Sequence, residues 1–560
     1  MKIRNINQEL ANSYSDDIKS FLKPIYAARN LVENDLDLSL KNILKPDFKD
    51  LPKALDILTN AILVQHKILI VGDFDADGAT SCALSITAFK NFGYTNVDFL
   101  VPNRFTHGYG LSPAIVDVAK NEFNPQVIIT VDNGISSFDG VILAKKYGIK
   151  VIITDHHLPS ESLPEADCII NPNLKDCNFN SKNLAGVGVS FYLFSSLKTH
   201  LQKIGYFESN NIPIPGMKNL LDLVALGTVA DVVPLDRNNR ILVSEGLKII
   251  RSEACNKGIL ALIRVAKKVK ETIKSSDLGF GIAPRINASG RLDDISIGIK
   301  CLLSIDNNNA LKYAEHLDEF NKNRKAVQEE MTLEAENIIK NQDLQQENFA
   351  ISLYDKSWHE GVVGIVAGKL KESYHCPTVI FAKSGDGLKG SARSIPSVHI
   401  KDLFDLIDRK YPKLILKFGG HAMAAGLSIE AEKFNDFQRI FSIEVENYLN
   451  GKLPDFELLT DGELLESDIN MENAKLLEQN IWGNGFEEPI FYGYFKIVEQ
   501  KIIGEKHLKL RLKLDKLVFN AIAFFTNPIE GKEIKIAYKL NINNYMNNES
   551  LQLIIEEINE

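Results

Sequence analysis

The sequence predicts an α/β protein whose largest domain is built on a parallel β-sheet and whose C-terminal part forms a small β-barrel. Two observations carry this prediction. Short, largely apolar runs at 68–71, 127–131 and 149–154 alternate with stretches of helical periodicity, which is typical of parallel strands buried on both faces. Residues 505–515 instead alternate strictly between apolar and charged side chains, which is typical of a strand with one exposed face.

The composition is that of an ordinary soluble protein of several domains. The 560 residues are 45% hydrophobic, enough for roughly three or four domains. Because the N-terminus is polar and no run of about 20 apolar residues could span a bilayer, we expect a cytoplasmic protein with no membrane partner. The six cysteines form no C-x-x-C pair, which argues against a zinc site and a disulfide framework. The net charge of −9 gives no sign of nucleic-acid binding, although a local basic channel is compatible with it.

Each of the three apolar runs is followed by an acidic residue. Helix-like stretches at 80–92 and 138–147 lie between the runs and complete the βαβ pattern. In a parallel sheet of this kind, ligands collect at the carboxyl ends of the strands. We therefore expect the acidic strand ends to share one crevice.

The first strand end, VGDFDADGAT at 71–80, carries Asp73, Asp75 and Asp77 at alternate positions. If the chain stays extended there, residues two apart point to the same side, so the carboxylates converge and repel one another unless a cation lies between them. The alternative is a turn rich in aspartate and glycine, in which Gly78 supplies a positive φ. This loop taken alone is compatible with both.

The third strand end, Asp155-His156-His157, combines imidazole with carboxylate. These ligands suit Mn, Zn or Fe better than the all-oxygen shell that Mg or Ca usually takes. Asp231, in a largely apolar segment, is a further candidate, and its alternative role is a plain helix-end cap. Together the acidic and histidine positions fit two metal ions about 3.5–4 Å apart, which hydrolytic enzymes use in displacements at phosphorus.

The motifs DFDADG, VDNGISS, TDHH and GTVADVVPL, in this order and spacing, resemble those of the DHH phosphoesterases. Within that family they are similar to the bacterial exonucleases that degrade single-stranded DNA from 5′ to 3′. The motifs GIAPRINASGRL, SWHEGVVGIVAGKL, KGSARSIP and FGGHAMAAGLSI extend the resemblance to about residues 65–430. The resemblance implies a metal-dependent exodeoxyribonuclease that releases 5′-mononucleotides and acts in DNA repair and recombination.

The resemblance also implies roles for the strand-end residues. It implies that two divalent ions, Mn²⁺ or Mg²⁺, are bound by Asp75, Asp77, Asp132, His156 and Asp231. Asp132 would bridge the ions and His157 would face the reacting phosphate, so we expect these two residues to be catalytic. Asp73 and Asp155 would be ligands or would orient the ligands.

Two glycine-rich motifs downstream predict a phosphate-binding surface. Ser391, Arg393 and His421 lie among small residues that expose backbone N–H groups, which phosphate binding requires. Glycine-rich packing against a helix is the alternative interpretation. Further candidates for phosphate contacts, on the strength of their motifs, are Arg104, Arg285 and Arg291.

The C-terminal strands predict a barrel of the OB type. In 505–515 the leucines face one way and Lys509, Arg511 and Lys513 face the other. A barrel of this kind binds single strands along a basic face with aromatic stacking. The alternative is a charged face that is merely solvated.

These patterns divide the chain into five parts. Residues 307–342 carry apolar side chains at three- and four-residue spacing, which predicts one long amphipathic helix. The parts are a helical lead-in (1–48), a DHH catalytic domain (49–240), a connecting helical region with the long helix (241–345), a DHH-associated substrate-binding domain (346–452) and an OB-like DNA-binding domain (453–560).

The resemblance implies single-stranded DNA as the substrate, with single-strand-binding protein and a RecQ-type helicase as candidate partners, and we expect a monomer. Two other functions stay open. A DHH oligoribonuclease or dinucleotide phosphatase would not need the C-terminal β-domain. A non-catalytic single-strand-binding relative would not need the metal ligands, and here every one of them is present.

Overall fold

The computed structural model describes the whole chain except residues 103–107, 109, 293, 342–348, 455–456, 505, 546–547 and 560. The chain divides into two compact units. The first contains Met1–Gly290, Asp294–Leu317 and Glu457–Glu560, and the second contains Arg291–Asp293 and Asp318–Phe456. Among the described residues, no helix is both long and apolar enough to cross a membrane.

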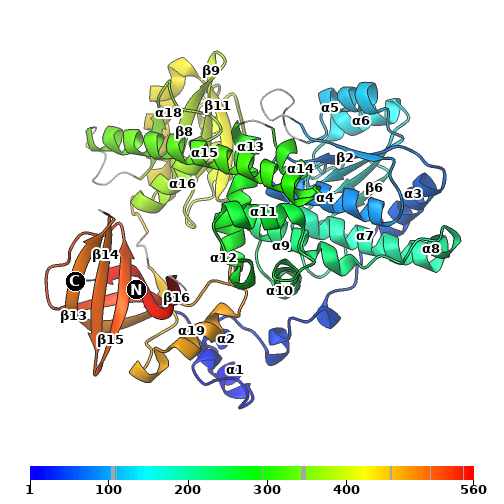
Figure 1. The fold of residues 1–560 in the computed structure, drawn as a ribbon. Helices are drawn as coiled ribbons and strands as arrows, with labels where there is room; N and C mark the ends of the chain where they lie inside the picture. Colours follow the sequence, from blue (N-terminus) through cyan, green and yellow to red (C-terminus); the bar gives the residue numbers. More distant parts are fainter. Residues whose placement is uncertain are drawn as a thin grey trace. The chain divides into compact units, whose positions relative to one another are not determined.

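The first unit is built on a five-stranded, wholly parallel sheet, as the sequence predicts (Figure 1). Its order is β3-β2-β4-β5-β6, and β2 and β4 are buried along their whole length. Helices α5 and α6 cover one face and α3, α4 and α7 the other. The strands are β2 (Ile68–Gly72), β3 (Val97–Leu100), β4 (Val127–Val131), β5 (Lys150–Thr154) and β6 (Cys168–Ile170), and the helices are α3 (Leu51–Leu63), α4 (Ala76–Asn91), α5 (Pro113–Val118), α6 (Phe138–Lys146), α7 (Gly186–Lys203) and α8 (Tyr206–Ser209).

Helix α4 starts earlier than the sequence periodicity predicts, and this corrects the expected geometry of the first acidic loop. Asp75 is the N-cap of α4 and its side chain accepts a hydrogen bond from the Gly78 amide, while Asp77 lies in the first helical turn. The aspartates therefore do not alternate along an extended segment. The cap competes successfully because an aspartate oxygen satisfies an amide that the helix leaves without a partner.

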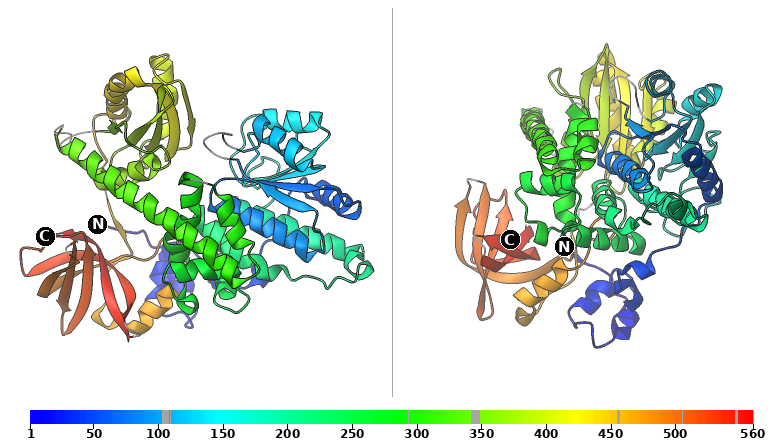
Figure 2. Two further views of the ribbon diagram at one scale, coloured as in Figure 1. Left: turned by 45° about the horizontal axis from the view of Figure 1, so that its top comes forward. Right: turned by 45° about the vertical axis from the view of Figure 1, so that its right-hand side comes forward.

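A group of helices follows the sheet and leads to the second unit. These helices are α9 (Leu221–Ala230), α10 (Arg237–Ile250), α11 (Lys257–Val265), α12 (Ser275–Asp277), α13 (Ala283–Leu292), α14 (Ser296–Leu302) and α15 (Asn307–Asn341). The predicted long helix is confirmed as α15, which is continuous over 35 residues (Figure 2). Residues 240 and 241, between which the sequence placed a boundary, both lie inside α10.

The second unit is a mixed five-stranded sheet of order β10-β11-β9-β8-β7. Residues of β8 alternate between two apolar clusters, so that Val379 and Phe381 pack on one face and Ile380 and Ala382 on the other. The elements are β7 (Ile351–Tyr354), β8 (Thr378–Ser384), β9 (Gly387–Arg393), β10 (Lys417–Gly420), β11 (Ala424–Glu430), α16 (Val363–Tyr374), α17 (Ile400–Lys410) and α18 (Phe434–Tyr448).

The C-terminal strands close into a barrel of order β13-β14-β15-β17-β16, which confirms the predicted architecture. On β14 the leucines 508, 510 and 512 are buried, while Lys509, Arg511 and Lys513 are exposed. The strands are β13 (Phe491–Ile503), β14 (His507–Leu514), β15 (Leu517–Phe524), β16 (Glu533–Tyr545) and β17 (Asn548–Asn559).

The N-terminal lead-in is not only helical. It contains α1 (Gln8–Ser13) and α2 (Leu22–Ala27), but it begins with β1 (Lys2–Ile3), which pairs in parallel with β12 (Leu459–Thr460). Arg29 forms a bidentate, buried ion pair with Asp461, at 2.6 Å. The lead-in is thereby attached to the segment that contains α19 (Met471–Glu478) and precedes the barrel.

Candidate metal centre

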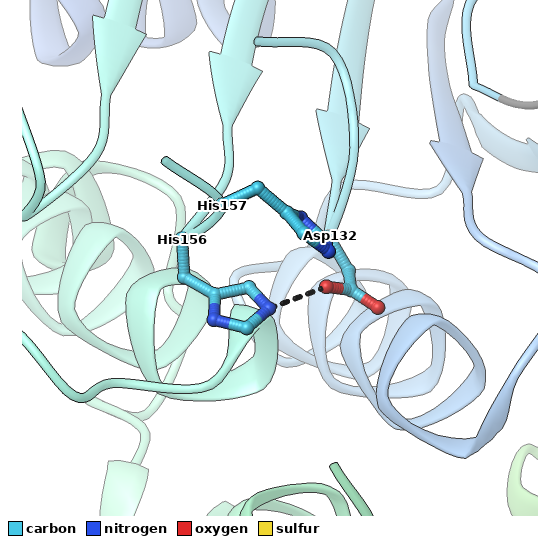
Figure 3. Close-up of side chains that lie close together, drawn as sticks. All are labelled: Asp132, His156 and His157. Atoms are coloured by element: carbon cyan, nitrogen blue, oxygen red, sulfur yellow. Dashed lines mark ion pairs between the residues drawn. The ribbon is translucent and has the colours of Figure 1, made fainter. Parts of the chain in front are cut away.

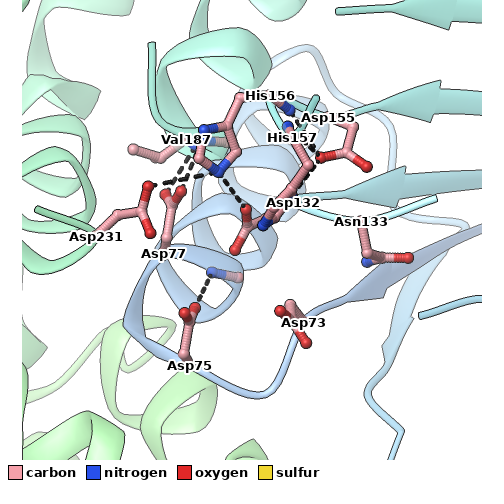
Figure 4. Close-up of polar contacts among 12 residues, drawn as sticks. Asp73, Asp75, Asp77, Asp132, Asn133, Asp155, His156, His157, Val187 and Asp231 are labelled. Carbon is pink, nitrogen blue, oxygen red and sulfur yellow. Dashed lines mark hydrogen bonds and ion pairs between the residues drawn. The ribbon is translucent and has the colours of Figure 1, made fainter. Parts of the chain in front are cut away.

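Acidic and histidine side chains meet at the carboxyl ends of β2, β4 and β5, as the sequence predicts for a parallel sheet (Figure 4). Asp132 directly follows β4, and Asp155 and His156 directly follow β5. Asp73 is the first residue after β2, before the loop enters α4.

The side chains form three overlapping groups, in each of which the potential ligand atoms lie within 4.8 Å of one another. The groups are Asp132, His156 and His157; Asp77, His156 and Asp231; and Asp73, Asp75 and Asp132. Asp132 and His156 each belong to two groups. Overlap of this kind is what a pair of neighbouring cations with a shared carboxylate requires.

Asp77 is oriented by the start of helix α7. Its two carboxylate oxygens accept hydrogen bonds from the backbone amides of Gly186 at 2.6 Å and Val187 at 2.9 Å. Glycine is required at 186, because a Cβ atom there would lie 2.6 Å from the Cβ of Asp132. A Cβ on Gly227 of α9 would likewise lie 2.9 Å from Oδ1 of Asp77. Sequence reasoning missed these glycines and amides because their role depends on segments far apart in the chain.

The surroundings of His156 are the most direct indication that the centre binds a cation. Burial lowers its pKa to about 4, so its imidazole is neutral. Its Nε2 atom makes no hydrogen bond with a described residue, yet it lies 3.1 Å from Oδ1 of Asp132 (Figure 3) and 3.4 Å from Oδ2 of Asp231 (Figure 4). A neutral imidazole nitrogen between carboxylates is a donor set for a divalent transition metal.

The carboxylates of the centre raise one another's pKa. Burial is the main cause at Asp73, Asp77, Asp132 and Asp231, and repulsion from neighbouring aspartates adds to it. The pKa of Asp77 is raised to about 7, and those of the other three are raised well above the ordinary range. Bound cations would remove this repulsion and return the groups to their charged form.

Asp155 belongs to none of the three groups and instead orients the histidines. One of its oxygens accepts a hydrogen bond from Nδ1 of His157 at 2.7 Å, and the other accepts from the Ile135 amide at 2.9 Å. Burial alone would lower the pKa of His157, but the hydrogen bond and charge of Asp155, with Asp73 and Asp75 nearby, raise it to about 9. His157 is therefore positively charged when no cation is bound.

Asp231 combines the two roles that the sequence left open. It is the C-cap residue of α9, and its carboxylate also faces His156 in the second of the three groups. The helix end thus places a carboxylate opposite the ends of β4 and β5.

Arg393, in the second unit, is a partly buried cation that has no ion pair with a described carboxylate. Its guanidinium donates hydrogen bonds to Oγ of Ser391 at 3.0 Å and to the Ala392 carbonyl at 2.8 Å. A Cβ on Gly364, in the first turn of α16, would lie 3.0 Å from the same guanidinium. Arg393 therefore lies beside a helix N-terminus, a combination that suits a phosphate group.

The remaining phosphate candidates are less closely grouped. His421 lies in the turn between β10 and β11, and β11 pairs with the strand that carries Arg393. Arg291 donates a hydrogen bond to the Gly361 carbonyl at 3.3 Å, and Arg285 to the Gly281 carbonyl. Arg104 lies outside the described residues.

The exposed basic residues of β14 adjoin aromatic and basic groups that the sequence did not single out. Lys513 lines a cavity of about 610 Å³ together with Tyr494 and Lys535. The Lys535 ammonium lies 5.4 Å from the ring centre of Tyr494. Arg511 is half-exposed and lies 3.6 Å from Glu499.

Comparison with known families finds three matches along the chain. Residues 67–228 match the DHH family, N-terminal domain; residues 346–447 match the DHHA1 domain; and residues 460–557 match the RecJ OB domain. The three matches correspond to the parallel-sheet region, the mixed sheet and the barrel.

The chain is also similar to named proteins over nearly its full length. It is 46% identical to the single-stranded-DNA-specific exonuclease RecJ of Escherichia coli, over 97% of this chain and 96% of that protein. The crystal structure of RecJ in complex with Mn²⁺ from Thermus thermophilus covers all of this chain and 79% of its own, with a TM-score of 0.81 and 25% identity. The Mg²⁺ complex of that protein has a TM-score of 0.75 at 24% identity, covering all of this chain and 78% of its own.

The raised carboxyl pKa values predict how pH affects the metal-free protein. A carboxyl whose pKa is higher in the folded than in the unfolded state binds more protons when folded, so stability falls as pH rises from about 4 toward the folded pKa, about 7 for Asp77. Removing one charge with Asp132→Asn should therefore raise the free energy of unfolding at pH 8 by at least about 1 kcal/mol, and by less at pH 5. Urea unfolding in EDTA measures this.

Asp98→Asn, on β3 outside the centre, is the control, and it should change stability equally at the two pH values. An equal gain at pH 5 and pH 8 for Asp132→Asn would show that the pKa of Asp132 is not raised in the folded protein.

Proposed function

The chain belongs to the RecJ family of single-stranded-DNA-specific exonucleases, and from this premise we propose that it removes 5′-mononucleotides from single-stranded DNA in the 5′→3′ direction. It is a metal-dependent nuclease that uses Mn²⁺ or Mg²⁺. The observation that carries the proposal is the neutral His156 nitrogen held between the buried carboxylate of Asp132 and the partly buried carboxylate of Asp231.

The side chains of the centre have separable roles in the proposed reaction. We assign the ligands of two ions to Asp75, Asp77, Asp132, His156 and Asp231, with Asp132 shared and Asp73 beside them. Bound divalent ions supply activation of water and stabilisation of the charge that develops at phosphorus. Asp155 accepts a hydrogen bond from Nδ1 of His157 and fixes its ring, so that His157 is oriented to contact the phosphate.

The complete donor set and the barrel favour this function over the alternatives. A non-catalytic relative has no need of three overlapping ligand groups. An oligoribonuclease or dinucleotide phosphatase has no need of the C-terminal barrel, whereas the Escherichia coli exonuclease matches the chain over almost its whole length.

We propose that Arg393 and Ser391 bind the 5′-terminal phosphate. Burial lowers the pKa of Arg393, which means that the charged guanidinium is poorly solvated and gains from an anionic partner. Arginine offers a planar fork to a phosphate, and the first turn of α16 adds backbone N–H groups. His421, Arg104, Arg285 and Arg291 are proposed to contact other phosphates of the strand.

We propose that Lys509, Arg511 and Lys513 guide the strand along the barrel. All three are exposed on one face of β14, and Tyr494 beside Lys513 offers a ring on which a base can stack. The buried leucines of the same strand hold the face in place from inside the barrel.

In the cell, the proposed role is DNA repair and recombination in the cytoplasm. Six free cysteines are compatible with a reducing compartment. We propose that the protein acts as a monomer, with a RecQ-type helicase that supplies single strands and a single-strand-binding protein that covers them.

A digestion experiment tests the proposed reaction and its metal centre together. With Mn²⁺, the protein should release the label of 5′-labelled single-stranded DNA as a mononucleotide at once and that of 3′-labelled DNA only late, and it should leave duplex DNA and RNA largely intact. Asp132→Ala should lower the rate at least about 100-fold, because the shared carboxylate is lost. Gel analysis of timed digests measures both.

Ca²⁺ in place of Mn²⁺ should support little cleavage, since it prefers more oxygen ligands than this centre offers. Near-normal turnover and metal binding by Asp132→Ala would contradict the two-ion assignment, and early release of the 3′ label would contradict the direction.

The second prediction concerns the strand end. Arg393→Ala should weaken binding of 5′-phosphorylated strands by roughly 10-fold or more, and should reduce the advantage of a 5′-phosphate over a 5′-hydroxyl end. Competition binding with the two kinds of oligonucleotide measures this. Lys383→Ala, on the neighbouring strand β8 but exposed, is the matched control. Equal losses on both ends would make Arg393 a general backbone contact.

The third prediction concerns the barrel. Replacing Lys509, Arg511 and Lys513 together with serine should lower the log–log salt slope of binding to long single-stranded DNA by roughly 0.7 for each phosphate contact removed. Cleavage of very short oligonucleotides should be spared, and the apolar side of β14 is unchanged, so the barrel should still fold. An unchanged salt slope would show that this face is only solvated.

A further inference from the structure

The loop that carries Asp231 out of α9 has an unfavourable backbone conformation. Val232 has φ 60°, in the left-handed region that a β-branched residue rarely adopts. Helices commonly end with glycine in this position, where no Cβ opposes the conformation. The Val232 side chain is 62% exposed, so its packing does not compensate for the strain. Something else must hold the loop.

A tight turn at 483–486 holds it by two hydrogen bonds. Nδ2 of Asn484 donates to the Val232 carbonyl at 2.6 Å, and the Leu235 amide donates to the Asn484 carbonyl at 2.8 Å. Asn484 thus binds the loop near both of its ends. The turn is closed by reciprocal backbone hydrogen bonds between Gly483 and Phe486, each 3.0 Å long.

The base of this turn is firmly anchored in the first unit. The Phe486 ring stacks on Trp482 with centres 4.8 Å apart, and the Arg240 guanidinium of α10 lies 4.4 Å from the centre of the Phe486 ring. The Trp482 carbonyl accepts a hydrogen bond from Oγ of Ser275 at 3.0 Å. The tip of the turn is therefore presented by a rigid base.

Packing holds the far end of the loop, where Gly483 and Gly485 lie against Leu235 and Pro234, but it leaves Val232 exposed. Asn484 is exposed, and a cavity of about 460 Å³ lies beside it, lined by Val232, Trp482 and Phe280 among others. If Asn484 lost its side chain, the backbone hydrogen bond from Leu235 to Asn484 would remain, but the Val232 carbonyl would lose the bond from Nδ2, and Val232 could then leave the left-handed region. Because Val232 directly follows Asp231, this change would loosen the last turn of α9 and displace the Asp231 carboxylate.

We propose that Asn484 is a positioning residue for the metal centre: it holds Val232 in its strained conformation and thereby fixes Asp231 opposite His156. The proposal rests on the proposed role of Asp231 as a metal ligand. It also gives the segment that leads into the barrel a function in the centre itself.

The test is Mn²⁺ binding to the full-length protein, measured by isothermal titration calorimetry and by electron paramagnetic resonance of free Mn²⁺. Asn484→Ala should weaken binding roughly 10-fold, as expected when a group that orients a ligand is lost. Asn480→Ala is the matched control, because Asn480 lies on the same segment but bonds Tyr26 and Leu476, and it should bind Mn²⁺ as the unaltered protein does.

A rescue variant separates strain from general loosening. Glycine adopts a left-handed conformation without cost, so in Val232→Gly/Asn484→Ala the loss of Mn²⁺ affinity should shrink to about 3-fold or less. Thermal unfolding in EDTA should show similar stability for all variants. A merely structural role of Asn484 would lower stability without restoring affinity in the double variant.

Asp231→Ala distinguishes failure of this inference from failure of the proposed function. If Asp231→Ala binds Mn²⁺ normally, Asp231 is not a ligand, and its assignment in the proposed function is wrong. If Asp231→Ala binds weakly while Asn484→Ala binds normally, or if the double variant is as weak as Asn484→Ala alone, the positioning role of Asn484 is overturned.

Discussion

Repulsion among buried carboxylates is the constraint on which the first unit depends. Asp73, Asp77 and Asp132 are nearly inaccessible to water and close together, an arrangement that costs free energy unless donors and cations surround it. The chain meets this cost with backbone amides at the starts of two helices, α4 for Asp75 and α7 for Asp77. Glycine at 186 lets the start of α7 approach Asp132, and glycine at 227 lets α9 approach Asp77 of α4. Divalent cations would relieve the repulsion that remains between the carboxylates, and this favours their binding.

The two units hold opposite charges away from full solvent exposure, and among the described residues these charges are not balanced by neighbouring side chains. The first unit holds an excess of buried carboxylates, and the second holds the partly buried guanidinium of Arg393 beside the N-terminus of α16. A divalent cation complements the former, and a phosphate group complements the latter. A metal-dependent nuclease acts on a polymer of phosphate groups, so both kinds of site are of use to it. The long helix α15 contributes residues to each unit.

Segments distant in the sequence pack against the helices and loops that carry the metal centre. The lead-in is attached through the buried Arg29–Asp461 ion pair to the stretch that precedes the barrel. The same stretch contributes Trp482 and Phe486, which pack under α10 and present Asn484 to the loop after Asp231. The barrel is therefore joined to the catalytic region by a folded connection rather than by a loose linker.

Sequence by itself determined the features that depend on neighbouring residues. Apolar runs and alternation specify the parallel strands and the barrel, and the residue types at the strand ends indicate metal chemistry, because periodicity and ligand chemistry are local properties. Tertiary structure alone decided which groups complete the centre. The amides that orient Asp77 lie 109 and 110 residues away, and Asn484 lies 252 residues from Val232. The first acidic loop is a different case: its aspartates cap and open α4 instead of alternating along a strand, and because the cap bond joins Asp75 to Gly78 only three residues on, this was a local signal that periodicity missed. Only the folded chain, by contrast, places Asp231 against His156. Such contacts depend on how whole helices pack, which no local pattern records.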